Sequence, residues 1–489
     1  MVPSKLYRPS LALLTDFYQI TMAYAAWKNG LAEREAVFSL TFRHAPFAGG
    51  FALACGLAHA VDHMRASRFD ESDLAYLAKQ RGADGEALFE QGFLDYLSRV
   101  SLACDLDAVP EGTAVFAHEP LLRVRGPIIP AMLLETPLLN LVNFQTLVAT
   151  KAARICLAAG DDPVIEFGLR RAQGMDGGLG ASRAAYIGGC SGTSNVLAGK
   201  LLGIPVKGTH AHSWVMLFAD ELDAFFAYAR ALPANSILLV DTYGSIAGVN
   251  KAIEVGRWLQ AQGRALVGIR LDSGDLAQLS VEARRLLDTA GLERTAIVAS
   301  NALDESLIRS LKEQGAAIAV WGVGTRLVTG HPDAALDGVY KLGAVRTRPG
   351  DPWAYRLKLS ERGEKASLPG ILQVRRYETA ERLRLDLIYD EELGAGSPPS
   401  LVDPLDGTRR DGIPQDARGE DLLVPVLRRG ELVSEAPSLD AIRLRARAGL
   451  ARLDEGLKRL DHPDEYPVLL ERNLYELRSR LVREAGGGG

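Results

Sequence analysis

The chain has 489 residues, 47% hydrophobic and 24% charged, which is ordinary globular composition with room for about three domains. Its formal net charge of −5 argues against a broad nucleic-acid-binding face but leaves room for a local basic pocket. The four cysteines lack metal-ligand spacing, and the N-terminus lacks a signal-type apolar run. The most apolar stretch, 127–144, is interrupted by prolines, so we expect a cytoplasmic protein with no disulfide framework, structural zinc or membrane span.

Residues 1–120 are predicted to be the N-terminal part of a mixed α/β domain. Thr15–Asp16 can cap a helix that stops at Asn29–Gly30, where the chain offers a C-cap signal. Residues 37–43 alternate between apolar and polar side chains as a strand does, and helical patterns follow from 58 to 97.

Residues 121–340 are predicted to form an α/β barrel. Short apolar runs alternate with helical segments, and their starts lie roughly 20–40 residues apart, which favours repeated strand–helix units and a parallel sheet. Six or more such units favour a closed or irregular (β/α) barrel, in which chemistry takes place on the loops after the strands. The predicted strands are 164–167, 205–208, 237–240, 266–269, 297–299 and 318–321.

Residues 341–485 are predicted to be a separate C-terminal segment of mixed α/β structure. Residues 345–430 are rich in arginine, proline and glycine, with short alternating strands. Amphipathic helices are predicted at 438–460 and 466–484, and the glycines at 486–489 are predicted to be a flexible tail.

Polar clusters follow the predicted strands and would converge on one face of a barrel. Gly322-Val323-Gly324-Thr325 has no bulky side chain to block its backbone amides, so it can cradle a phosphate. Arg170, Arg171 and Arg270 can supply forked donors to phosphate or carboxylate, or form salt bridges at the rim. Neighbouring acidic residues could hold a Mg²⁺–diphosphate or a pair of ribose hydroxyls, or simply form turns. These are Asp241, Asp272 and Asp275.

Two histidines, His210 and His212, lie two residues apart on a predicted strand, so we expect both to point to the same face. Such a pair could bind a metal, as in metal-dependent amide hydrolases. That site needs further histidines at later strand ends, and only His331 and His462 follow, neither at such a position. A single catalytic histidine, acting as nucleophile or as acid and base, fits better than the hydrolase alternative.

Five motifs, in order along the chain, resemble those of the nicotinate phosphoribosyltransferase family, and the similarity runs from about residue 11 to 345. The resemblance implies a type II phosphoribosyltransferase, with an irregular α/β barrel and a mixed α/β domain formed from both chain ends. It implies synthesis of nicotinate mononucleotide from nicotinate and 5-phosphoribosyl 1-diphosphate, coupled to ATP hydrolysis with Mg²⁺. The motifs are Leu14 to Gln19, Glu166 to Gly180, Gly208 to Ser213, Arg270 to Asp275 and Gly322 to Thr325.

The same resemblance implies a homodimer with active sites shared between subunits, and a role for each matching residue. The phosphorylated histidine would be His212, which directly precedes Ser213, whereas His210 stands where the family more usually has a residue that does not titrate. No Walker A sequence is present, so ATP would use the same phosphate cradle as the substrate. The implied nicotinate contacts are Tyr18, Phe167, Arg170, Thr209 and Arg270, with Asp272 on the ribose and Gly322, Gly324 and Thr325 on the 5-phosphate. The candidate metal ligands are Asp241 and Asp275.

Other functions on related folds remain alternatives at this point. The nicotinamide-using relative carries an acidic residue where this chain has Ser194, and a serine neither attracts an amide nor repels a carboxylate, so nicotinate is favoured. The decarboxylating quinolinate enzyme is shorter and needs more basic residues. A catalytically dead paralogue would have lost His212, Asp272 or the glycine-rich loop, all of which are present.

Overall fold

The computed structural model describes residues 11–359, 367–410 and 412–486, and the chain divides by its internal contacts into two units. Residues 1–147 and 335–489 form the terminal unit, and residues 148–334 form the central unit. A domain built from both chain ends is therefore present, as the resemblance implied. Most of the predicted flexible tail, residues 487–489, lies outside the described residues.

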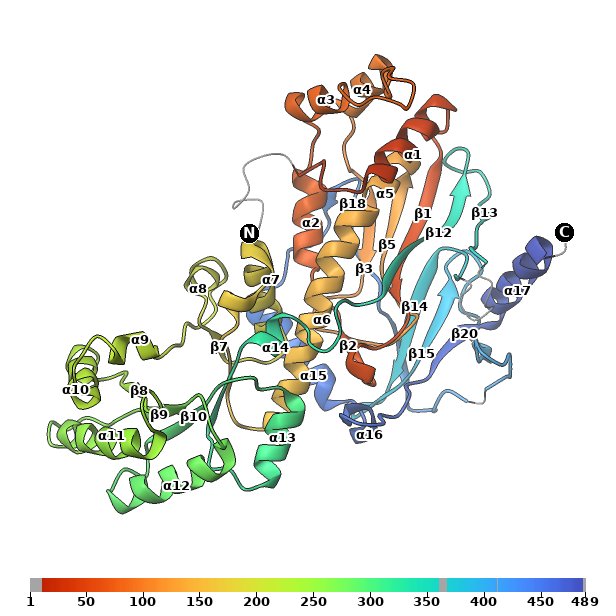
Figure 1. Ribbon diagram of the computed structural model, residues 1–489. Helices are drawn as coiled ribbons and strands as arrows, with labels where there is room; N and C mark the ends of the chain where they lie inside the picture. Colours follow the sequence, from red (N-terminus) through yellow and green to blue (C-terminus); the bar gives the residue numbers. More distant parts are fainter. Residues whose placement is uncertain (1–10, 360–366, 411, 487–489) are drawn as a thin grey trace. The chain divides into compact units, whose positions relative to one another are not determined.

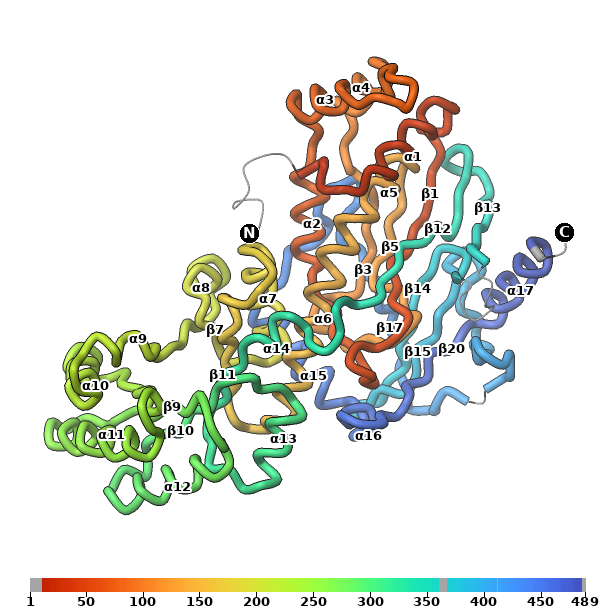
Figure 2. The backbone as a smooth tube through the Cα atoms, in the orientation of Figure 1, coloured from red at the N-terminus to blue at the C-terminus, as the bar shows by residue number. Residues whose placement is uncertain are grey.

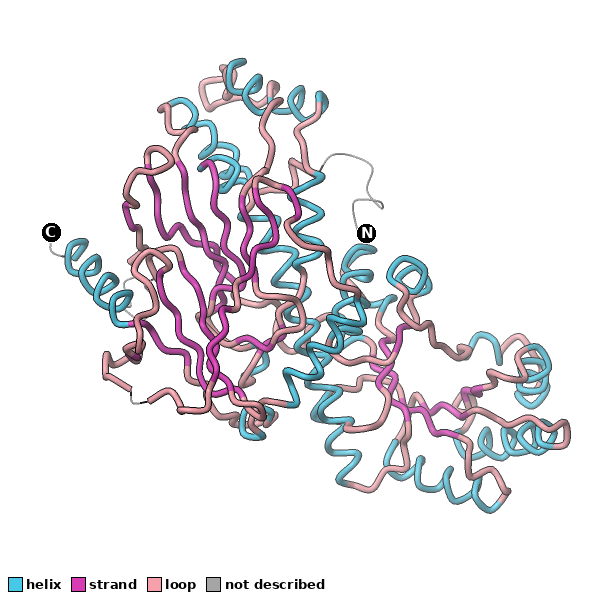
Figure 3. Tube along the Cα trace, turned by 180° about the vertical axis from the view of Figure 1, so that it is seen from behind, coloured by secondary structure: helices cyan, strands magenta, loops and turns pink. Residues whose placement is uncertain are grey.

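The terminal unit contains a seven-stranded antiparallel sheet, which Figures 1 and 3 show as a broad layer of strands. The predicted first helix is confirmed as α1 (Phe17–Lys28), with Asp16 at its N-cap and Asn29 at its C-cap. The predicted helical region 58–97 contains three helices, α2 (Leu57–Ala66), α3 (Glu71–Leu77) and α4 (Gln91–Leu97). The strands, in sheet order, are β13 (Ala354–Tyr355), β12 (Gly338–Arg346), β1 (Glu35–Phe42), β5 (Pro120–Pro127), β3 (Asp105–Ala108), β18 (Val424–Arg428) and β19 (Glu431–Leu432).

The boundaries of the central unit differ from the predicted 121 and 340. Strand β5 pairs with β1 and β3, and α5 (Ile128–Leu133) packs on α1, so the terminal unit continues to residue 147. Strand β12 also pairs with β1, which returns the chain to the terminal unit before residue 340. The helix α6 (Glu135–Ala159) carries the chain from one unit into the other.

A second sheet of the terminal unit comes from the C-terminal part of the chain. The predicted helix at 438–460 is interrupted, because α15 (Leu439–Ala451) ends before α16 (Glu455–Lys458). The predicted helix at 466–484 begins too early, because residues 468–471 form a strand that pairs with β15 and β16 before α17 (Arg472–Gly486) starts. The strands, in order, are β16 (Leu401–Val402), β20 (Val468–Glu471), β15 (Leu383–Asp390), β14 (Leu372–Glu378) and β17 (Arg418–Asp421), and β2 (Ala52–Leu53) and β4 (Ala114–Val115) form a separate pair.

The central unit is built on a six-stranded parallel sheet, which confirms the predicted α/β architecture. Within the described part of the chain the edge strands β7 and β8 do not pair with each other, so the barrel is irregular. Its strands, in order, are β7 (Gly192–Thr193), β6 (Val164–Glu166), β11 (Val320–Val323), β10 (Ala296–Ala299), β9 (Gly268–Leu271) and β8 (Ile237–Leu239).

Helices follow the strands of the central unit in sequence, and α10, α11 and α12 pack successively beside one another, as the tube in Figure 2 shows. They are α7 (Gly174–Ile187), α8 (Val196–Leu202), α9 (His212–Val215), α10 (Glu221–Ala231), α11 (Ser245–Gln260), α12 (Leu276–Thr289), α13 (Glu305–Glu313) and α14 (Thr325–Val328). Among the described residues no helix is both long and apolar enough to cross a membrane.

The prediction of a strand at 205–208 is wrong, since only Val206 makes an isolated bridge, to Thr193. The sheet edge is formed instead by the two-residue strand β7, which is too short to give an apolar run in the sequence. The predicted strands at 266–269 and 318–321 exist but begin two residues later, because their first apolar residues belong to the preceding loops.

Candidate active site

Most predicted site residues of the central unit lie at the carboxyl ends of its strands or in the loops that follow. Arg270 is the penultimate residue of β9, and Asp272 and Asp275 follow this strand. Gly322 lies in β11, with Gly324 and Thr325 directly after it. Because parallel strands end at the same edge, residues far apart in sequence are brought together here. The other members are Phe167 and Arg170 after β6, Ser194 after β7, Thr209 and His212 before and in α9, and Asp241 after β8.

Arg270 is the centre of a hydrogen-bond network that joins several strand ends. Its Nε donates to Ser300 Oγ at 2.8 Å, and one Nη donates to Thr209 Oγ1 at 2.9 Å. The other Nη contacts Asp272 Oδ1 at 3.1 Å, and the hydroxyl of Ser300 also donates to this oxygen. The guanidinium carbon lies 5.8 Å from the centre of the Phe167 ring. A nearly buried cation is therefore held in one orientation, with an aromatic face beside it.

Asp241 organises the loop after β9. Its Oδ2 accepts from the backbone N–H of Asp272 at 3.0 Å and from Ser273 Oγ at 2.6 Å. Its Oδ1 is buried and has no hydrogen-bond partner among the described residues. Asp275 instead caps α12, where its Oδ1 accepts from Gln278 N–H at 3.1 Å, so a structural role accounts for that carboxylate.

The two histidines do not share a face as predicted, because residues 210–212 are not a strand. His210 is 7% exposed, and its Nε2 accepts from the backbone N–H of Leu239 at 3.1 Å while its ring packs edge-on against Tyr228. Burial lowers the pKa of His210 to about 4, so this imidazole is neutral at ordinary pH. Its Nε2 lone pair is committed to the backbone, which leaves it unsuited to attack an electrophile.

His212 is the accessible histidine of the pair, with 43% of its side chain exposed. It begins α9, and its Nδ1 lies 3.2 Å from Thr242 Oγ1, which belongs to the loop after β8. Its Nε2 lies 3.9 Å from Asp272 Oδ2. The imidazole is thus held beside the Arg270–Asp272 network while remaining open to a substrate.

Glu166, which sequence reasoning left without a role, is a buried carboxylate that fixes the loops around Phe167 and Ser194. It is 1% exposed and accepts from Gly168 N–H, from Ser182 Oγ and from Thr193 Oγ1. Its own carbonyl accepts from Ser194 N–H at 2.9 Å. In the sequence, Glu166 directly follows the apolar residues Val164 and Ile165. An acidic residue at the end of such a run is the feature that could have predicted a buried structural carboxylate.

Some predicted residues are not drawn into these networks. Arg170 and Thr325 are exposed, and Ser194 is half-buried, which leaves their side chains accessible to a ligand. Tyr18 lies on α1 of the terminal unit and is 47% exposed. Within the described residues no group of three or more His, Cys, Asp or Glu side chains is arranged as a metal site.

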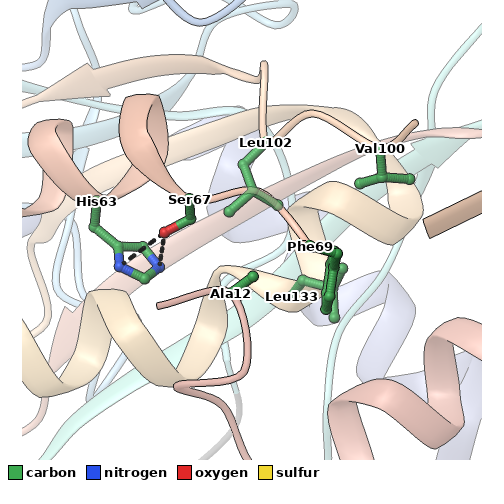
Figure 4. A pocket seen from close by; sticks show the side chains of 7 residues that line it. All are labelled: Ala12, His63, Ser67, Phe69, Val100, Leu102 and Leu133. Carbon is green, nitrogen blue, oxygen red and sulfur yellow. Dashed lines mark hydrogen bonds between the residues drawn. The ribbon is translucent and has the colours of Figure 1, made fainter. Parts of the chain in front are cut away.

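A small pocket in the terminal unit is separate from the predicted site residues. Figure 4 shows that His63 and Ser67 face each other across one side of it, with Ser67 Oγ 3.3 Å from His63 Nδ1. Burial lowers the pKa of His63 to about 4. The volume of the pocket is about 10 Å³, enough for one water molecule but not for a pyridine ring. The remaining lining residues are Ala12, Phe69, Val100, Leu102 and Leu133.

Comparisons with known proteins agree over most of the chain. Residues 13–143 match the nicotinate phosphoribosyltransferase N-terminal domain, 163–348 the nicotinate phosphoribosyltransferase family and 373–478 its C-terminal domain. The nicotinate phosphoribosyltransferase of Bacillus subtilis is 39% identical over 97% of both chains. That of Homo sapiens is 37% identical over 96% of both chains. The crystal structure of human nicotinic acid phosphoribosyltransferase superposes with a TM-score of 0.82 at 35% identity, covering 96% of this chain and 100% of that one.

Proposed function

This chain belongs to the nicotinate phosphoribosyltransferase family of enzymes, and we propose that it joins nicotinate to 5-phosphoribosyl 1-diphosphate. The products are nicotinate mononucleotide, a precursor of NAD, and diphosphate. ATP hydrolysis drives the reaction through transient phosphorylation of His212. The observation that carries the proposal is the Arg270 network, which sets a fixed cation beside an aromatic ring and an accessible imidazole.

Arg270 supports nicotinate as the substrate because a guanidinium matches the fork of a carboxylate. Three of its five N–H groups are used by Thr209, Ser300 and Asp272, which leaves one on each terminal nitrogen for a ligand. Phe167 offers its ring face to the pyridine, and Ser194 places no negative charge there. An acid substrate is therefore favoured over the amide.

His212 supports the coupling to ATP because its side chain is accessible and a ring nitrogen of histidine can act as a nucleophile toward phosphorus. A ring nitrogen attacks the γ phosphorus of ATP, so an N–P bond forms as the bond to the β,γ-bridging oxygen breaks and ADP leaves. After phosphoribosyl transfer, water attacks the phosphorus, the N–P bond breaks and phosphate departs. The imidazole is then restored for the next cycle.

The remaining residues position 5-phosphoribosyl 1-diphosphate. The 5-phosphate binds at Gly324 and Thr325, because Gly324 has no side chain of its own to cover the backbone amides. Asp272, held by Arg270 and Ser300, accepts from ribose hydroxyls. Glycosyl transfer from a diphosphate passes through an oxocarbenium-like state, so catalysis requires positioning and charge neutralisation of the leaving group.

Mg²⁺, when bound, neutralises charge on the diphosphate leaving group. The orphaned buried oxygen Asp241 Oδ1 fits such an ion, because Mg²⁺ prefers one or two carboxylates together with substrate phosphate oxygens and water. Asp275 contributes less, since one of its oxygens caps α12. The donor set therefore suits an ion that arrives with the diphosphate rather than one held by the protein alone.

A homodimer with shared sites is part of the proposal. On α1, Phe17, Tyr18 and Met22 are 54%, 47% and 39% exposed, and such an apolar face is typical of an interaction surface. Tyr18 of one subunit would complete the pyridine site of its partner, opposite Phe167.

The deciding experiment is product analysis with nicotinate and nicotinamide side by side, each with 5-phosphoribosyl 1-diphosphate and Mg²⁺, with and without ATP. The proposal expects nicotinate mononucleotide as the main product and its formation to increase with ATP. Comparable turnover of nicotinamide would favour the amide-using relative. Absence of any mononucleotide would overturn the assignment of the reaction itself.

A further inference from the structure

Gly322 is placed by its motif in the phosphate cradle, yet its surroundings indicate a different role. We infer that Gly322 is a positioning residue of the pyridine site, because its missing side chain makes the space in which the Phe167 ring lies. The inference rests on the proposed function only in that Phe167 stacks on nicotinate. It assigns Gly322 to nicotinate specificity rather than to binding of the 5-phosphate.

The position that a side chain would occupy at Gly322 is filled by the ring of Phe167. A Cβ built on Gly322 would lie 2.7 Å from Cδ2 and 2.8 Å from Cε2 of that ring, and 3.4 Å from the carbonyl oxygen of Ala299. Carbon atoms in contact normally stay about 3.5–4.0 Å apart, so the ring and a methyl group cannot both be accommodated. Neighbouring Trp321 and Val323, whose side chains alternate to the opposite face of β11, are fully buried.

Sheet order explains why the ring must cross β11 at this point. Phe167 follows β6, Arg270 lies on β9, and β11 and β10 lie between these strands. The Phe167 ring approaches the Arg270 guanidinium, with 5.8 Å between its centroid and the guanidinium carbon. A ring that reaches from β6 toward β9 has to lie over β11, and a residue without a side chain permits this.

The backbone that carries Phe167 has little freedom to retreat. The N–H of Phe167 donates to Val323 O at 2.8 Å, and Gly168 N–H donates to the carboxylate of Glu166. Gly168 is itself tightly packed, since a Cβ there would overlap a methyl carbon of Val328. A side chain at 322 would therefore displace the ring rather than the backbone, and the ring is the part that contacts the pyridine.

The test is a double-mutant cycle between Gly322→Ala and Phe167→Leu, with KM measured separately for nicotinate and for 5-phosphoribosyl 1-diphosphate. Gly322→Ala should raise the KM for nicotinate roughly three- to tenfold, in the range of one lost aromatic contact, and leave the other KM within about twofold. In the Phe167→Leu background the same change should have little further effect, because the ring it displaces is gone. Gly449→Ala is the matched control, since it lies outside all five motifs and its Cβ would meet no atom closer than 3.9 Å.

A rise in the KM for 5-phosphoribosyl 1-diphosphate, or equal effects of Gly322→Ala in both backgrounds, would overturn the inference while wild-type activity upheld the proposed function. If the wild type formed no nicotinate mononucleotide, both would fall. Should Gly322→Ala alone fail to fold, the double variant should fold, because removing the ring opens the space. Loss of folding in both variants would also count against the ring as the neighbour that matters.

Discussion

Substitution of His210 and of His212 should have different effects: His210→Ala should lower the stability of the protein, and His212→Ala should remove the coupling to ATP. His210→Ala removes the acceptor of the Leu239 N–H and leaves a buried donor unpaired, which costs about 1–3 kcal/mol. For a protein unit of this size, 1 kcal/mol shifts the unfolding temperature by about 2–4 °C, so His210→Ala should unfold some 2–12 °C below the wild type. His212→Ala should unfold near the wild-type temperature, because this side chain is 43% exposed.

The assay pairs thermal unfolding with transfer of label from γ-labelled ATP, followed by peptide mapping. Wild type and His210→Ala should carry an acid-labile, base-stable label on the peptide that contains His212, measured below the unfolding temperature. His212→Ala should lose both the label and the stimulation of product formation by ATP, yet keep slow phosphoribosyl transfer. A label on His210, or full ATP stimulation in His212→Ala, would refute the reasoning.

Three further outcomes are expected. Ser194→Asp should raise the KM for nicotinate about tenfold or more by setting like charges together, and an unchanged KM would contradict the nicotinate site. Tyr18→Ala and Arg270→Ala should each lose activity but regain part of it when subunits are exchanged, and no recovery despite exchange would contradict shared sites. Burial, and next the charge of Asp386, raise the pKa of Glu119 in the folded protein. A carboxyl group with a raised pKa stabilises the folded state in its protonated form. This contribution to stability is therefore complete below the usual pKa near 4.3 and is lost as pH rises through the raised value. Glu119→Gln should flatten this decline in denaturant unfolding measured from pH 5 upward, whereas an unchanged slope would assign the decline to other groups.

Much of the central unit could be predicted because its strands are short apolar runs that end in polar clusters. The runs that begin at Val164, Ile237 and Ile297 correspond to strands within one residue at each end, and their order gives a parallel sheet. The edge strand at Gly192 could not be found, since a two-residue strand has no periodicity. The strand predicted at 205–208 was wrong for a related reason, because a run this short does not distinguish a strand from a loop that contains apolar residues.

What the sequence could not give is the direction in which each side chain points. The alternation of side chains along a strand predicted that His210 and His212 share one face, but these residues do not form a strand. His210 is buried, whereas His212 is accessible at the site. The motif likewise assigned Gly322 to a phosphate, although its neighbour in space is Phe167, 155 positions away in the chain. Both cases depend on contacts between different strands. Residue types at strand ends therefore indicate the chemistry of a site, whereas the role of each residue depends on which strands are neighbours.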